Sequence, residues 1–226
     1  CLVGSEMCIR DSLKIYEKRI GQESGALSVL DELIVNSAIY SQIIGVNREG
    51  MDARVEAKLT ELARAQGVPS YLLLLFLIKR QGELEIDDAT LAKIVELLTL
   101  FFVRRNVTDT PPTRDLERLF INICECIEDK GLSGVGVARY VKERLVDISA
   151  SDATFEDRLA GPIYDVNPDM TRYILTTLAE PSVTKEMKGL WERYPSGNYV
   201  WTIEHVFPQG ENIPKDLSLI HISEPT

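Results

Sequence analysis

The residues best suited to chemistry lie near the C-terminal end of the chain, where Tyr199–Gln209 reads YVWTIEHVFPQ. An acid, Glu204, directly precedes a histidine, His205, at the end of a segment rich in β-branched and aromatic residues, which favours a strand. Hydrolysis of a phosphodiester needs a water molecule deprotonated near neutral pH and a cation that stabilises charge on the leaving oxygen. Histidine suits the first task, and a carboxylate that binds Mg²⁺ or Mn²⁺ suits the second. For such a reaction, His205 is the candidate general base and Glu204 the candidate metal ligand.

The residues around this pair bear on the same question. Pro208 cannot continue a strand ladder, so it would turn the backbone away and let two adjacent side chains act on one centre. Trp201 and Ile203 alternate with polar residues and are expected to pack in a core. Asn212 follows too closely to be assigned a function. The alternative interpretation is a surface or satisfied core histidine, because short motifs are weak signals.

Helical periodicity dominates the chain before this segment. From Leu13 to about Glu180, apolar residues recur at helical spacing, with short connections that favour an antiparallel, mainly α architecture. The expected helices span residues 24–44, 51–66, 70–81, 89–106, 114–129, 135–146, 152–159 and 169–178.

Local signals set several of the expected helix ends. Asp87 or Asp88 can cap the helix that follows, and Thr113 can do the same for the next, because short polar side chains accept hydrogen bonds from free N–H groups. Gly67 and Gly131 lie just past helices that they are expected to end.

Other segments carry their own signals. Pro69 opens residues 70–81, which are apolar nearly all round and are expected to be buried. Gly161–Pro168 is expected to be a loop, Lys185–Arg193 could form a short helix, and the composition of Tyr194–Asn198 is typical of a turn.

Composition bounds the class of protein. The formal net charge is −10, with 45% hydrophobic and 27% charged residues, as in soluble globular proteins. This charge excludes a protein that coats nucleic acid nonspecifically, but a local DNA site is compatible with it. The longest apolar run, Tyr71–Ile78, is too short to span a bilayer. We therefore expect a cytoplasmic protein without a membrane partner.

Two pairs of residues have both a functional and a structural interpretation. Cys124 and Cys126 form a CxC in a helix, which does not close easily into a disulfide and lacks a second pair for zinc, so we expect half-buried thiols. Arg104 and Arg105 could touch phosphate, but cations in a last helical turn suit the helix dipole, and we favour solvated side chains.

Three stretches of the sequence resemble the GmrSD-type restriction endonucleases. They are WTIEHVFPQGENIPKD at residues 201–216, FFVRRNVTDTPPTRDLERLF at residues 101–120 and TFEDRLAGPIYDVNPDMTRYILTTLAE at residues 154–180. The resemblance covers most of the chain and is most specific at EHVFPQ. It implies a ParB-like nucleotide-binding domain upstream, a helical region, and a C-terminal HNH, or ββα-metal, nuclease domain.

The resemblance also implies a function for the complete protein. Glu204 and His205 match the acid–histidine pair of the nuclease motif, which would use Mg²⁺ or Mn²⁺. The complete enzyme would cleave modified phage DNA in a reaction linked to hydrolysis of a nucleoside triphosphate at the upstream domain. The helical region is expected to join the two domains rather than to bind DNA.

Both ends of the chain are expected to be foreign to the rest. Residues 1–12 and 217–226 resemble translated sequencing-adapter read-through and are set aside, so a site that combined His205 with His221 would be an artefact. Residues 13–180 then form the helical region, and residues 181–216 form the truncated start of the nuclease domain. We expect such a fragment to be inactive. The alternative is a helical interaction or scaffold protein in which EHVFP is incidental.

Overall fold

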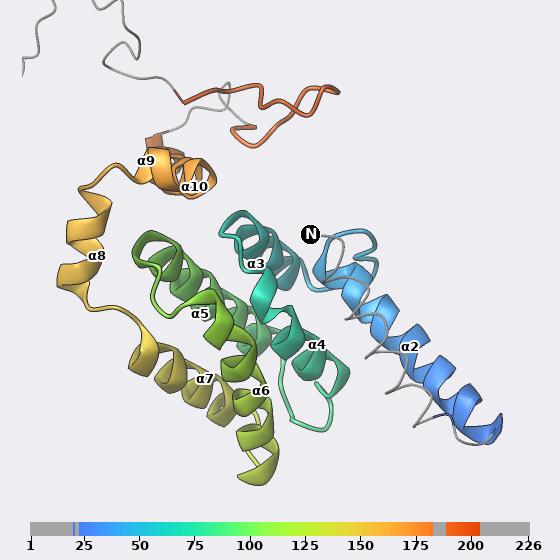
Figure 1. Cartoon of the computed structure of the whole chain (residues 1–226). Coiled ribbons are helices and arrows are strands. Elements are labelled where there is room, and N and C mark those ends of the chain that lie inside the picture. The colour runs from blue at the N-terminus through green and yellow to red at the C-terminus, as the bar shows by residue number, and fades with distance from the viewer. Residues whose placement is uncertain (1–19, 21–22, 183–188, 204–226) are drawn as a thin grey trace, which may run out of the picture. The chain divides into compact units, whose positions relative to one another are not determined.

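The computed structural model describes residues 20, 23–182 and 189–203 (Figure 1). Helices are the only regular elements of this described part, which confirms the predicted mainly α class. The α-helices are α2 (Glu23–Ile43), α3 (Ala53–Arg64), α4 (Tyr71–Lys79), α5 (Asp88–Thr108), α6 (Thr113–Asp129), α7 (Val135–Ile148), α8 (Asp152–Leu159), α9 (Ile163–Val166) and α10 (Pro168–Ala179), and the 3₁₀ helices are η1 (Val68–Ser70) and η2 (Glu180–Ser182). The chain divides into two compact units at Thr171 and Arg172.

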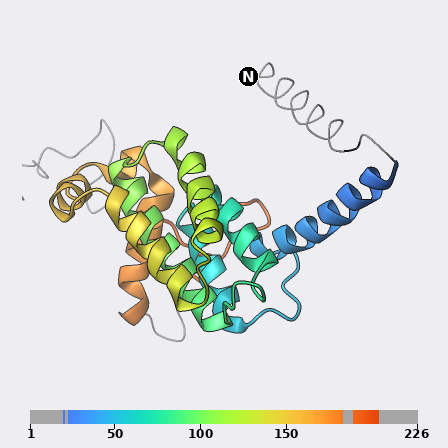
Figure 2. The ribbon, with the colours of Figure 1, turned by 90° about the horizontal axis from the view of Figure 1, so that it is seen from below.

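Helix α5 lies at the centre of the first unit. It packs against α3, α7 and α8, and α5 and α7 run side by side in Figure 2. A helix that is apolar over most of its surface must be surrounded, and α5 has this composition. Its Phe101 and Phe102 meet Phe120 of α6 in a cluster with ring centroids 5.2 to 6.5 Å apart. Offset and edge-to-face aromatic packing of this kind stabilises a core beyond the area that it buries.

Side chains cap the first turns of several described helices. Asp52 accepts hydrogen bonds from the backbone N–H groups of Arg54 and Val55, and Ser151 accepts one from Thr154. Asp87 accepts one from the Thr90 N–H at 2.7 Å, and hydrogen bonds from Thr90 hold the pKa of the Asp87 carboxyl below its usual value. The prediction that Asp87 or Asp88 caps α5 is thus confirmed for Asp87.

The predicted cap at Thr113 is wrong. Pro112 occupies the N-cap position of α6, without a capping side chain, and Thr113 is the first helical residue. The Thr113 hydroxyl instead accepts a hydrogen bond of 2.7 Å from Arg105. The hydroxyl that local sequence predicts as a cap is thus bound by Arg105 of α5.

Two further expectations need correction. The expected loop Gly161–Pro168 contains the short helix α9. The expected buried helix over residues 70–81 is η1 followed by α4, and only one side of α4 is buried. Leu73, Leu74 and Leu77 are fully buried, but Leu72 is 44% exposed.

The two predicted glycine stops behave differently. Gly131 has a φ of +58° directly after α6, as expected for a helix stop. After α3 the left-handed residue is Gln66, with a φ of +62°. Gly67 is needed for a close approach instead, because a Cβ atom there would lie 2.1 Å from the Cδ1 atom of Leu62.

Helix α2 packs along α4 by one side (Figure 1). Tyr40 and Tyr71 meet edge to face at 6.3 Å, and the Lys79 ammonium lies 3.2 Å from the Glu32 carboxylate. Ile43 is fully buried at the end of the helix. Within the described residues, no helix is both long enough and apolar enough to cross a membrane.

Candidate functional site

The predicted pair Glu204 and His205 lies outside the described residues, which end at Ile203. The structure does describe the segment that leads into the pair. In the second unit this segment, residues 189–203, follows α10 and η2 in the chain. Its geometry shows how the chain is held before the motif begins.

The predicted turn at Tyr194–Asn198 is confirmed. The Tyr194 N–H donates to the Asn198 carbonyl at 2.8 Å, and the Gly197 N–H donates to the Tyr194 carbonyl at 2.8 Å. Gly197 has a φ of +87°, which glycine adopts without a steric cost. Arg193 and Tyr199 pair across this turn in a single antiparallel bridge.

The strand expected from Tyr199 onwards does not form within the described residues. Tyr199 pairs with Arg193 and the Val200 N–H donates to the Glu192 carbonyl at 2.9 Å, but no strand continues from there through the last described residue, Ile203. A strand needs a neighbour along several residues. β-Branched and aromatic residues favour an extended chain, but they do not supply that neighbour.

Arg172 holds this segment to α10. Arg172 is only 8% exposed. Its guanidinium donates to the Trp201 carbonyl at 2.7 Å and to the Leu190 carbonyl at 3.3 Å. These acceptors lie 29 and 18 residues further along the chain. A planar guanidinium can bond two acceptors at once and still stack on a ring, which lysine cannot do.

Aromatic rings complete the arrangement around Arg172. The guanidinium carbons of Arg172 and Arg193 lie 3.8 and 3.9 Å from the centre of the Tyr199 ring. Trp191 lies between Tyr199 and Tyr173, with ring centroids 6.1 and 6.4 Å away. A cation desolvated against an aromatic face is stabilised by the ring quadrupole, so Tyr199 offsets part of the cost of burying Arg172.

A small cavity lies beside Arg172. Its volume is about 220 Å³, and α10 residues Leu175 and Thr176 face Trp201 and Ile203 across it. This is below the size of a typical ligand pocket. Trp201 is 40% exposed, so the core packing that its position predicts is only partly realised.

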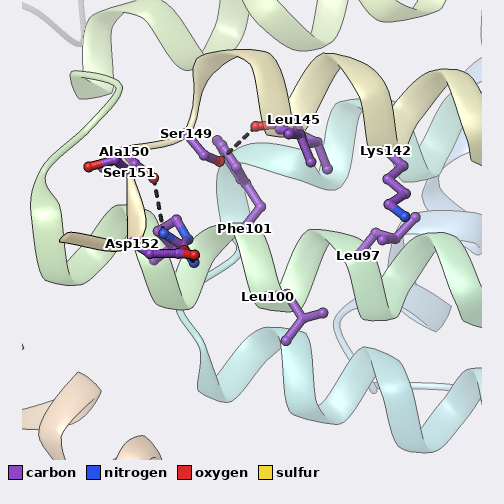
Figure 3. Close-up of a pocket in the computed structure, with 11 residues that line it drawn as sticks. Leu97, Leu100, Phe101, Lys142, Leu145, Ser149, Ala150, Ser151 and Asp152 are labelled. Carbon is purple, nitrogen blue, oxygen red and sulfur yellow. Dashed lines mark hydrogen bonds and ion pairs between the residues drawn. The ribbon is translucent and has the colours of Figure 1, made fainter. Parts of the chain in front are cut away.

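The first unit holds a mostly apolar groove of about 530 Å³ between α5 and α7 (Figure 3). Leu100, Phe101 and Leu145 line it, and Lys142 extends toward Leu97 at one end. Its size is that of a ligand site, but the chemistry of its walls suits apolar groups.

A second, more polar hollow of about 720 Å³ lies near the end of α5. Its amide side chains already have structural roles. Asn167 donates to the Gln66 side chain at 2.9 Å, and Asn106 donates to the Ala65 carbonyl at 2.9 Å. These bonds tie the α9–α10 connection and α5 to the end of α3.

Arg104 and Arg105 are committed to contacts within the protein rather than solvated as expected. Arg104 donates to the Ala150 carbonyl at 3.0 Å and to the Asp152 carboxylate at 2.6 Å. Arg105 donates to the Pro111 carbonyl, to Thr113, and to the side chains of Asn106 and Asp109. Each arginine secures a connection between helices, and neither is available as a free phosphate contact.

The two helical cysteines match their structural interpretation. Cys124 and Cys126 are free thiols and half-buried. Burial raises the pKa of Cys124 to about 12, so its thiol stays protonated and is a poor nucleophile. Within the described part of the chain, no group of three or more His, Cys, Asp or Glu side chains is placed to hold a metal ion.

Comparison with protein-family models, with curated proteins and with solved structures finds no match for this chain. Sequence reasoning missed that Arg172 of α10 binds the carbonyl groups of Leu190 and Trp201. The only signal available was an arginine among the apolar residues of DMTRYILTTL.

Proposed function

We propose that this chain belongs to a metal-dependent DNA endonuclease, with His205 as the general base and Glu204 as a metal ligand. The resemblance of YVWTIEHVFPQ to an HNH motif supports the proposal most directly. One observation from the described residues adds to it. Arg172 binds the backbone carbonyl of Trp201, three residues before Glu204, and a catalytic pair needs a rigidly held approach.

The donor set suits a hard divalent cation. The Glu204 carboxylate offers the oxygen ligands that Mg²⁺ and Mn²⁺ prefer. When bound, the cation would stabilise negative charge on the leaving oxygen of the cleaved phosphodiester. His205 would accept the proton of the water molecule that attacks phosphorus, since an imidazole titrates near neutral pH.

The wider role follows from the same resemblance. The substrate would be modified phage DNA, and hydrolysis of a nucleoside triphosphate would belong to a domain upstream of Leu13. The helical region, residues 13–180, would then join that domain to the nuclease domain. Their internal use of Arg104 and Arg105 supports a connecting role over a DNA-binding one.

The test is to express the complete reading frame around residues 13–216 and to assay cleavage of modified and unmodified DNA with Mg²⁺ or Mn²⁺ and a nucleoside triphosphate. His205→Ala should lower the rate by about 10²- to 10⁴-fold, the usual contribution of a general base. Glu204→Gln should weaken metal binding, so that a higher concentration of Mg²⁺ or Mn²⁺ is needed for cleavage. Glu180→Gln, an exposed acid in η2, is the matched control and should leave the rate unchanged.

The outcome that contradicts the proposal is cleavage that survives His205→Ala, or a complete reading frame that never cleaves DNA.

A second candidate function, a helical interaction protein, is favoured by a different observation. Helix α2 exposes large apolar side chains, among them Leu27 and Ile34, that a protein without a helical partner would rarely leave in water. On this candidate Glu204 and His205 have no catalytic role. The complete reading frame would then bind a protein partner and show no nuclease activity.

A further inference from the structure

Helix α2 carries an apolar stripe on the side opposite to α4. The stripe consists of Leu27, Leu30, Ile34, Ala38 and Ser41, whose spacing of three and four residues places them on one helical face. Leu27, Leu30 and Ile34 are 65%, 53% and 58% exposed. Residues on the other side, such as Glu32 and Ile43, are the ones that contact the rest of the unit or are buried.

Side-chain size changes along the α2 stripe. Its N-terminal half contains the exposed Leu27 and Leu30, whereas its C-terminal half contains the exposed Ala38 and the half-buried Ser41. The hydroxyl of Ser41 donates to the Ala38 carbonyl at 2.7 Å. The adjacent Ser37 hydroxyl donates to the Ile34 carbonyl at 2.9 Å. Because these hydroxyls are satisfied within the helix, the C-terminal half forms a shallow surface that can be desolvated at little cost.

The charges of α2 all have one sign. The helix sequence contains Glu23, Asp31 and Glu32 and no basic residue. Asp31 lies beside the stripe and is exposed. Two copies packed in parallel would bring identical acids together, whereas an antiparallel pair centred near Ile34 would separate them along the helix axis.

We propose that this chain pairs with a second copy of itself through the α2 stripe, antiparallel, with the two-fold axis near Ile34. Leu27 and Leu30 of each copy then lie over the small Ala38 and Ser41 side chains of the other, and the two Ile34 side chains meet at the axis. Large side chains thus fill the spaces left by small ones, which is the condition for close helix packing. An isologous interface of this kind closes on itself as a dimer.

The interface is small. A helix of 21 residues is about 30 Å long, so one face of it gives an interface at the low end of those seen in specific complexes. The dimer should therefore dissociate on dilution. The inference concerns assembly and stands whether or not the chain belongs to a nuclease.

The first test is sedimentation equilibrium of the full chain over a range of concentrations. The wild type should show a reversible monomer–dimer equilibrium, and Leu30→Glu should raise the dissociation constant at least about tenfold. Leu100→Glu, at a 61% exposed position of α5, is the matched control and should leave dimerisation unchanged. Circular dichroism confirms that each variant keeps its helices.

Ala38→Leu separates the proposed fit from unspecific apolar association. It enlarges the apolar surface, but in the antiparallel pair it meets Leu30 of the other copy. We expect weaker dimerisation, and a stronger association would overturn the proposal.

Cysteine cross-linking tests the orientation in a background in which the native cysteines are replaced. Ile34→Cys should form an intermolecular disulfide readily, because both copies of this residue lie at the axis. Leu27→Cys should cross-link only when combined with Ser41→Cys. Efficient cross-linking of Leu27→Cys alone would indicate a parallel pair and overturn the proposal.

The proposal also fails if the wild type stays monomeric at all concentrations. If, in addition, Leu30→Glu lowers the thermal stability of that monomer, then the chain itself covers the stripe. A basic helical peptide from another protein that binds the stripe and leaves the chain monomeric would likewise replace the proposed partner.

Discussion

Each of the two compact units is stabilised internally by a different kind of contact. In residues 23–171 the elements meet through apolar side chains, with Phe102 and Phe120 fully buried and stacked at 6.1 Å. In residues 172–203 the described contacts centre on a charged side chain, Arg172, whose guanidinium binds two carbonyl groups and lies over Tyr199.

The difference shows that the size of a unit determines which kind of interaction stabilises it. A long chain of helices can bury many aliphatic and aromatic side chains, and the apolar area removed from water then dominates. A short helix and a turn enclose too little area for that. Directional hydrogen bonds to carbonyl groups, together with a cation on a ring, can hold them in one geometry, but removal of one residue then removes several contacts at once.

The largest expected effect comes from a substitution in the apolar core of the first unit. Phe102→Ala should destabilise the first unit by about 3–5 kcal/mol, because it removes a large buried ring and leaves a cavity. Urea unfolding followed by circular dichroism measures the change. Leu100→Ala, two positions away on the same helix but 61% exposed, should change stability by less than about 0.5 kcal/mol. Equal effects of the two variants would show that α5 is not the core helix.

The second largest effect comes from removing the polar contacts of Arg172 in the second unit. Arg172→Leu should destabilise the second unit by about 1.5–3 kcal/mol, the scale of hydrogen bonds that involve a charged group. Both tryptophans of the chain, Trp191 and Trp201, lie in this unit, so tryptophan fluorescence reports on it alone. The fluorescence should become that of solvent-exposed indole while the helical circular dichroism signal persists. Arg172→Lys should fail to restore the wild-type spectrum, and full restoration would mean that charge alone suffices.

The smallest effect sharpens the comparison by isolating a local contribution within the first unit. Asp87→Ala should lower stability near neutral pH, because the cap of α5 is lost. The folded-state pKa of Asp87 is depressed, so its contribution is present above the unfolded pKa of about 3.9 and is lost as the pH falls through the lower folded value.

Thermal unfolding as a function of pH measures this contribution. The gap between wild type and Asp87→Ala should close below about pH 4. Asp87→Asn is the control, since asparagine caps helices without a titrating group, and its stability relative to Asp87→Ala should stay constant with pH. A gap that is independent of pH in the wild type would contradict the role of the carboxylate.

The accuracy of the sequence predictions follows the range of the interactions involved. The helix over 152–159, the cap at Asp87, the stop at Gly131 and the turn at Tyr194–Asn198 are all confirmed, because each depends on residues within a few positions of one another. The predicted roles of Glu204 and His205 stay predictions.

The errors arise where distant residues compete for the same group. Thr113 does not cap α6 because Arg105 binds its hydroxyl, and Arg104 bonds within the protein because Ala150 and Asp152 accept its hydrogen bonds. No periodicity or capping rule contains such pairings.

The sequence by itself thus determined the mainly helical class, most of the helix ends and the local turns, since backbone hydrogen bonds and apolar periodicity act at short range. Only the tertiary structure decided that Arg172 reaches Trp201 across 29 residues and that α2 exposes Leu27, Leu30 and Ile34. Both depend on which surfaces the folded chain brings together, and a side chain's partner in space is independent of its neighbours in sequence.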